Sequence, residues 1–230
     1  MLYLEKQPII ATVLRNIAVL SDLLPLILFI FFARAKKNIG LRVAFYIVVF
    51  SAFINFFVLS NRQAREYTFL IGRITTLVEY SLLSLLFFNI ILSKTFKKGM
   101  IAVTVLIGVY LLYDLFSAAN NSFDSVPSGI TSLVFLIYCI FYLFERVNDP
   151  TSLFLYSSPV FWVVVALIIY SAGTFFPFIY AQSHMKEDEF RSEYNLIHDI
   201  LYIFKNILLA CAMLVTDKTL KPLHSMTKKK

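Results

Sequence analysis

Seven hydrophobic segments divide this 230-residue chain. A helix needs about 20 mostly apolar residues to cross the hydrocarbon core of a bilayer, where every backbone polar group has to be satisfied within the segment. Short polar turns separate the segments, which cover roughly residues 12–33, 43–60, 67–92, 100–119, 130–144, 155–181 and 195–215. The sequence therefore predicts an all-α fold, a bundle of seven transmembrane helices in which residues 1–230 form a single integral membrane domain.

The composition agrees with a chain whose main partner is the lipid bilayer. Hydrophobic residues make up 59% and charged residues 15% of the chain, whereas soluble domains carry about 25% charged residues. The formal net charge of +7 arises largely from Lys and Arg near helix ends. In a membrane protein such residues set the orientation, so we expect no nucleic-acid partner.

The distribution of Lys and Arg predicts which end of the bundle faces the cytoplasm. These residues are concentrated in the turns after the first and third segments and in the C-terminal tail. Cytoplasmic loops carry an excess of Lys and Arg. We therefore expect the N-terminus outside and the C-terminus in the cytoplasm, in a multi-pass protein of a bacterial inner (cytoplasmic) membrane.

The seventh segment carries a polar face within an otherwise apolar helix. Its polar residues recur at helical spacing, which places them on one side: Asn195, His198, Asp199, Tyr202, Lys205 and Asn206. A charged side chain at the centre of a membrane helix costs about 2.5–3.5 kcal/mol on insertion scales. We therefore expect other helices to supply partners for this face.

Four charged residues inside other segments are the expected partners. Asp22 lies in the first segment, Arg73 and Glu79 in the third, and Asp114 in the fourth. In the predicted orientation all of them lie at mid-depth or nearer the outside. Together with the seventh segment they predict an outward-facing polar pocket above a sealed inner half: Asp22, Arg73, Glu79, Asp114, His198, Asp199, Tyr202, Lys205 and Asn206.

Two interpretations of this cluster remain open. Intramembrane ionisable residues are candidates for a binding site or an ion path, but opposite charges can also form a structural network. In either case we expect Lys205 to be charged and paired with Glu79 or, failing that, with Asp22.

Three residues are candidates for kinks or close helix packing. Pro25 interrupts the first segment, and Pro177 the sixth. A proline removes a backbone donor and clashes with the carbonyl four residues earlier, which for Pro177 belongs to Gly173. We expect the sixth helix to bend near Pro177 and a neighbouring helix to approach Gly173 closely.

Lys205 in the last helix, with Glu79 in the third, has the layout of the microbial rhodopsins, in which a lysine carries retinal. The chain departs from that pattern, because Leu201 stands where those proteins have an Asp and Trp162 is the single tryptophan. We therefore expect no retinal on Lys205 and no other cofactor.

Metal binding and lipid hydrolysis are two further kinds of chemistry that intramembrane polar residues can carry. The three histidines are scattered between a loop, a helix and the tail, so we expect no metal site, which needs three or four protein ligands. Glu79 with Asp22 or Asp114 could serve a lipid hydrolase as general acid and base. Pairing with Arg73 or Lys205 would keep these carboxylates ionised, which disfavours a general acid.

Three stretches carry a family resemblance: VEYSLLSLLFF, FWVVVALIIYSAGTFFPFIY and IHDILYIFKNILLACAML. They resemble uncharacterised seven-helix bacterial membrane proteins and are similar to the membrane sensor halves of some histidine kinases. The resemblance implies a receptor or sensor role without known chemistry. No kinase domain follows Thr216, so we expect a signal to pass to a separate partner protein.

The expected function is therefore a non-enzymatic membrane receptor or sensor-like protein. A small transporter or channel is the alternative, and it would need a polar path through the inner half. An intramembrane lipid hydrolase and a retinal-binding photoreceptor are the remaining alternatives.

Overall fold

The computed structural model describes residues 9–32, 38–61, 67–117, 125–149, 155–184 and 187–215. All the regular structure in these residues is helical. The helices are α1 (Ile9–Ser21), α2 (Leu23–Phe31), α3 (Ile39–Ser60), α4 (Thr68–Ile90), α5 (Lys94–Ser117), α6 (Ser125–Val147), the short 3₁₀ helix η3 (Leu155–Ser157), α7 (Pro159–His184) and α8 (Asp188–Leu214). Within these described ranges, seven spans are long and apolar enough to cross a membrane, with α1 and α2 together forming the first. The protein is thus a helical bundle of the multi-pass membrane type.

Several helices extend beyond the predicted segments. α5 starts at Lys94 rather than near residue 100, α6 runs from Ser125 to Val147 rather than over 130–144, and α8 starts at Asp188 rather than at 195. Hydropathy detects only the apolar part of a helix, whereas backbone hydrogen bonding continues into polar turns. The predicted ends of the first and seventh segments, near residues 33 and 215, lie at or beyond the limits of the described helices.

Backbone hydrogen bonding is interrupted near the middle of the first span. α1 ends at Ser21 and α2 begins at Leu23. Pro25 has no N–H to donate to the carbonyl of Ser21, four residues earlier, and its ring crowds that carbonyl. The N–H of Asp22 instead donates to the carbonyl of Val19 over 3.4 Å. The sequence predicted one continuous segment with Pro25 as a kink. Asp22, where the two helices meet, keeps right-handed helical backbone angles (φ −59°, ψ −31°), so the span is interrupted there without being unwound.

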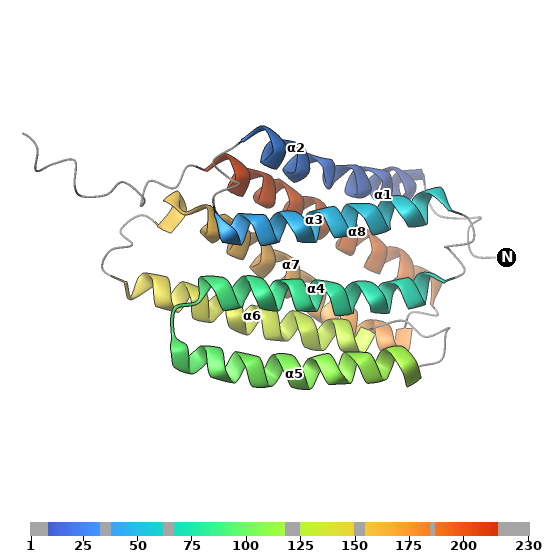
Figure 1. Ribbon diagram of the computed structural model, residues 1–230. Helices are drawn as coiled ribbons and strands as arrows, with labels where there is room; N and C mark the ends of the chain where they lie inside the picture. The colour runs from blue at the N-terminus through green and yellow to red at the C-terminus, as the bar shows by residue number, and fades with distance from the viewer. Residues whose placement is uncertain are drawn as a thin grey trace, which may run out of the picture.

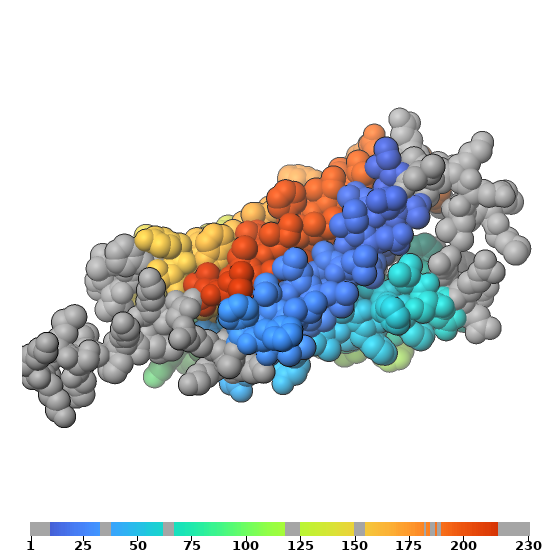
Figure 2. All heavy atoms as spheres, turned by 90° about the horizontal axis from the view of Figure 1, so that it is seen from above, coloured from blue at the N-terminus to red at the C-terminus, as the bar shows by residue number. Residues whose placement is uncertain are grey.

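Six of the spans surround a common centre, and α5 lies outside them. α1 and α2 pack along α8, α8 packs on α7, α7 on α6, α6 on α4, α4 on α3, and α3 on α2 (Figure 1). α5 packs on α4 and α6 at the edge of the bundle. Figure 2 shows α1 and α2 lying along α8 on one face of the molecule.

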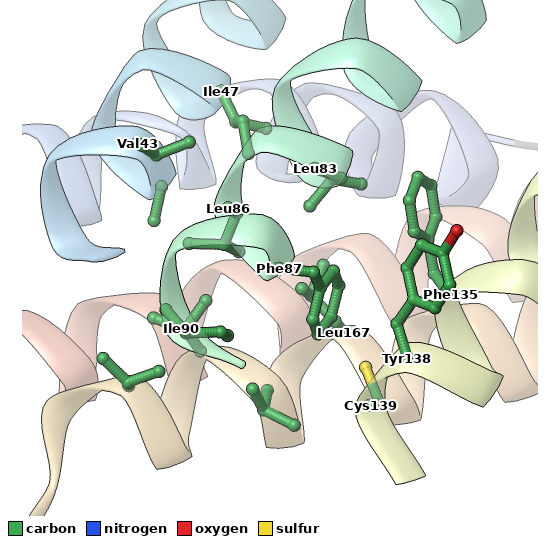
Figure 3. Close-up of a cluster of buried hydrophobic side chains, with 14 of the residues drawn as sticks. Val43, Ile47, Leu83, Leu86, Phe87, Ile90, Phe135, Tyr138, Cys139 and Leu167 are labelled. Atoms are coloured by element: carbon green, nitrogen blue, oxygen red, sulfur yellow. The ribbon is translucent and has the colours of Figure 1, made fainter. Parts of the chain in front are cut away.

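The apolar core fills the half of the bundle away from the start of α1. It draws on the first half of α3, the end of α4, the second half of α6 and the first half of α7 (Figure 3). Leu86 and Phe87 have no exposed surface. The Phe87 ring lies 6.3 Å from that of Phe135 and 5.6 Å from that of Tyr138. Rings packed in this way are typical of protein interiors, and no charged side chain belongs to this core.

α7 and α8 pack closely at Gly173. A Cβ atom added at Gly173 would lie 2.6 Å from Cδ1 and 2.7 Å from Cδ2 of Leu201, so only a residue without a side chain fits without displacing Leu201. Small residues commonly allow such approaches between membrane helices. α7 continues through Pro177 to His184, so the proline does not end the helix. A bend at Pro177 remains a prediction.

We expect Gly173→Ala to lower the free energy of unfolding by about 1–3 kcal/mol, the usual effect of overpacking. Gly108→Ala is the matched control, because no atom lies within 4 Å of the added Cβ. It should be neutral or stabilising by up to about 1 kcal/mol, since Ala has a higher helix propensity than Gly. Unfolding in mixed micelles, followed by circular dichroism, would measure both. Equal stability of the two variants would contradict the close approach.

Candidate functional site

A cavity of about 410 Å³ lies at the centre of the six surrounding spans. It reaches from Arg15, Thr68 and Asn195, towards the end of the bundle where α1 begins, to Leu86 and Leu209 at the apolar core. No described residue of α5 lines it. The polar face of α8 forms one wall of the cavity through His198, Tyr202, Lys205 and Asn206.

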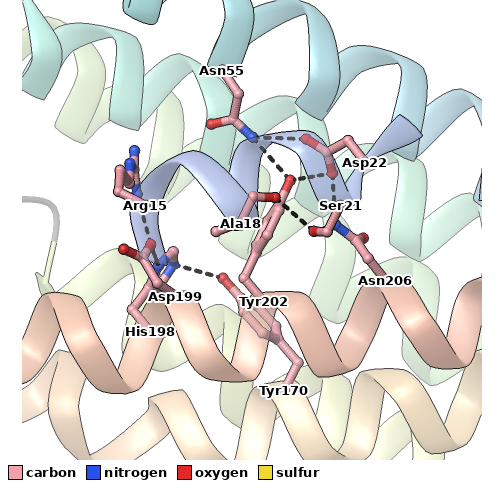
Figure 4. Close-up of polar contacts among 10 residues, drawn as sticks. All are labelled: Arg15, Ala18, Ser21, Asp22, Asn55, Tyr170, His198, Asp199, Tyr202 and Asn206. Atoms are coloured by element: carbon pink, nitrogen blue, oxygen red, sulfur yellow. Dashed lines mark hydrogen bonds and ion pairs between the residues drawn. The ribbon is translucent and has the colours of Figure 1, made fainter. Parts of the chain in front are cut away.

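Asp22 is the most heavily hydrogen-bonded acid in this cavity (Figure 4). Its Oδ1 accepts from Tyr202 Oη and from Asn206 Nδ2, both at 2.8 Å. Its Oδ2 accepts from Asn55 Nδ2 at 3.0 Å. Asp22 is 1% exposed, and a buried carboxylate requires such donors. The contacts tie the break between α1 and α2 to α3 and α8.

A second polar group lies nearer the start of α1. Arg15 Nη1 donates to Asp199 Oδ1 at 3.0 Å, with the Asp199 side chain 4% and the Arg15 side chain 50% exposed. His198 Nε2 lies 3.0 Å from Tyr170 Oη. The group connects the first span to α8, and α8 to α7.

Glu79 faces the cavity from α4. Ser51 Oγ of α3 donates to Glu79 Oε1 at 2.8 Å. Glu79 is only partly buried and belongs to the cavity lining. Among the described residues, no cationic nitrogen lies within 4.0 Å of its carboxylate.

Lys205 lies over two tyrosine rings. Its Nζ is 3.9 Å from the centre of the Tyr202 ring and 4.7 Å from that of Tyr170. Within the described part of the chain, no carboxylate oxygen lies within 4.0 Å of this nitrogen. The predicted direct pair with Glu79 or Asp22 is therefore wrong for this structure. Aromatic faces attract a cation, and the donors described above take up Asp22 instead.

Arg73 and Asp114 lie elsewhere. Arg73 Nε is 3.2 Å from Asp114 Oδ2, between α4 and α5, and neither residue lines the cavity. The prediction of one cluster was therefore wrong for this pair. The reason is rotation about α4: Arg73 and Glu79 are six residues apart, so at 3.6 residues per turn their side chains point about 120° apart. Depth in the membrane does not determine which neighbour a side chain meets.

The structure adds residues that the predicted site omitted. Arg15, Ser51, Asn55 and Tyr170 all contact predicted site residues. Spacing could have indicated two of them, because Ser51 and Asn55 are four residues apart and share one face of α3. Tyr170 carried no comparable signal, since a tyrosine in a membrane helix most often packs or lies at the interface.

The cavity has the composition of a small-molecule site. Such sites are concave and mostly apolar, have volumes of about 300–1,000 Å³, and contain a few fixed polar groups. Here Asp22, Glu79 and Lys205 are held by neighbouring side chains. No group of three His, Cys, Asp or Glu side chains that could hold a metal ion occurs in the described residues. Comparison of the chain with protein-family models, curated proteins and solved structures gives no match.

Proposed function

We propose that this protein is a non-enzymatic membrane receptor or sensor that binds a small molecule in the central cavity. The observation that carries the proposal is the cavity of about 410 Å³, bounded by polar side chains and by the apolar core. Its volume falls within the range of known ligand sites. The close packing of Phe87 against Phe135 and Tyr138 supports binding without passage through the bundle.

The proposed orientation has the N-terminus outside and the C-terminus in the cytoplasm of a bacterial inner membrane. Its support is the concentration of Lys and Arg in the turns after the first and third segments and in the C-terminal tail. In this orientation the ligand enters from outside, past Arg15, Thr68 and Asn195.

The broken first span is the proposed moving element. Asp22 stands at the break, and its partners Tyr202 and Asn206 belong to α8. A ligand that contacts α8 beside these residues would favour one angle between α1 and α2 over another. A conformational change requires that the ligand bind the two states with different affinity. The change passes to a separate partner protein.

Transport is the second candidate function, and the buried ionisable residues Asp22 and Lys205 favour it. Ionisable residues at membrane depth often mark substrate or ion pathways. In that case the apolar core would have to open during the cycle. The two functions differ in whether the bound molecule crosses the membrane.

A cysteine in the cavity tests the proposal. Gly72 lines the cavity, and an added Cβ would meet no atom within 4 Å. Small polar metabolites are screened for thermal stabilisation of Gly72→Cys before and after reaction with a bulky thiol reagent. If the protein is a receptor, the screen should identify compounds that stabilise the unlabelled Gly72→Cys protein and no longer stabilise it after labelling. These compounds should not accumulate in proteoliposomes. Accumulation supports transport, and a screen without such compounds rejects both functions.

A further inference from the structure

We infer that the cavity binds a small zwitterion with an apolar side chain, its ammonium group at Glu79 and its carboxylate at Lys205; the inference rests on the proposed ligand-binding function. Both residues line the same cavity. The two charges are opposite, yet their atoms are more than 4.0 Å apart. A molecule between them can contact both.

The other charged residues of the lining already have partners. Arg15 pairs with Asp199 at 3.0 Å. Both oxygens of Asp22 accept hydrogen bonds from neutral side chains. Lys205, by contrast, is 7% exposed and makes no hydrogen bond or ion pair to the described residues. Charged groups at membrane depth normally pair with one another or with the backbone.

The sign of the charges selects the ligand class. A simple cation would pair with Glu79 but would bring a second positive charge towards Lys205. A simple anion would pair with Lys205 and would be repelled by Glu79. A zwitterion neutralises both residues without adding net charge to a site of low dielectric constant, where unpaired charge is costly.

Both charged groups are held in place before a ligand arrives. The rings of Tyr202 and Tyr170 lie beside the Lys205 ammonium group. Ser51 Oγ donates to one oxygen of Glu79 at 2.8 Å. Groups that are already ordered lose little conformational freedom on binding. This arrangement fits a site more closely than it fits two chance surface charges.

The rest of the cavity selects the side chain of the ligand. Below Glu79 and Lys205 the lining is apolar and includes Ile47, Leu83, Phe135 and Leu167. An aliphatic or aromatic group would bury its surface there, which favours binding. Amino acids with apolar side chains combine this group with the two charges.

Matched probes test the inference. L-phenylalanine is compared with phenethylamine, which lacks the carboxylate, and with 3-phenylpropionate, which lacks the amine. L-leucine is compared with isoamylamine and 4-methylpentanoate in the same way. Titration calorimetry on the full chain in nanodiscs should show at least one amino acid binding tenfold or more tightly than both of its partners.

Two variants assign the charges. Glu79→Gln should weaken binding of that amino acid about tenfold and abolish its advantage over the anion. Lys205→Met should weaken it similarly and abolish its advantage over the amine. Asp114→Asn is the control, because Asp114 pairs with Arg73 outside the cavity. This variant should bind the amino acid with the same affinity as the parent protein. Circular dichroism and gel filtration establish that each variant is folded.

Three results would overturn the inference. The first is that neither amino acid binds more tightly than its singly charged analogues. The second is that a singly charged analogue binds as tightly as the amino acid or more tightly. The third is that both variants fold and bind the amino acid as tightly as the parent protein does. The comparison of the amino acids with their singly charged analogues on the parent protein tests the inference even if a variant does not fold. Failure here, with other compounds still entering the cavity of Gly72→Cys, would leave the receptor proposal standing. Failure of both measurements would reject the receptor proposal as well.

Discussion

Replacing Asp22 with leucine is expected to lower the free energy of unfolding by about 2–4 kcal/mol. Asp22 accepts hydrogen bonds from Tyr202, Asn206 and Asn55. Hydrogen bonds between membrane helices contribute about 0.6 kcal/mol on average and up to about 1.7, whereas a buried donor left unsatisfied costs about 1–3 kcal/mol. Each of these three donors loses its hydrogen bond to Asp22, which gives the expected loss of about 2–4 kcal/mol. Unfolding in mixed micelles would measure the change.

Asn89→Leu is the control for this substitution. Asn89 is exposed, and its side chain donates to Leu85 O of the same helix. Its replacement should change the stability by less than about 0.5 kcal/mol, as for most surface positions. If Asp22→Leu were as stable as the Asn89 variant, the hydrogen bonds at the break would not hold the first span to α3 and α8.

Arg15→Met is expected to destabilise the protein by about 2 kcal/mol. The substitution removes the arginine from Asp199, whose side chain is 4% exposed, and leaves His198 Nδ1 at 3.7 Å as its remaining ionisable neighbour. Removing one partner of a fully buried pair costs about 3–5 kcal/mol. We expect less here, because the Arg15 side chain is 50% exposed and solvent already screens it.

The double variant Arg15→Met with Asp199→Asn checks the cause. This variant removes both members of the pair. Its loss of unfolding free energy should therefore be smaller, by about 1 kcal/mol or more, than the sum of the losses in the two single variants. Additive effects of the two substitutions would show that Arg15 and Asp199 do not stabilise each other, and the link between the first span and α8 would have to lie elsewhere.

The sequence predicted the seven spans well because hydropathy reports directly on the residues that can cross a bilayer. The break at Asp22 was visible only as Pro25. Whether a proline bends a helix or divides it depends on neighbours that satisfy the freed polar groups, and here these come from α3 and α8.

The composition of the site was predicted less well, for a physical reason. Depth does not define rotation about the helix axis, so Arg73 and Glu79 were assigned to one cluster although they face different neighbours. Charge alone suggested that Lys205 would pair with an acid. The alternative, an ammonium group over Tyr202 and Tyr170, depends on how α7 and α8 pack, and that packing is set by Gly173 and Leu201.

An opening of the cavity only at the end of the bundle where α1 begins is the geometry on which the proposed function depends. It is tested most directly with Gly72→Cys in a Cys211→Ala background, in which the native Cys139 is fully buried. A membrane-impermeant thiol reagent is applied to either side of sealed vesicles of known orientation, with Gly108→Cys on α5 as the control outside the cavity. We predict rapid reaction of Gly72→Cys from the N-terminal side alone. Reaction at equal rates from both sides, or from neither, would contradict the account.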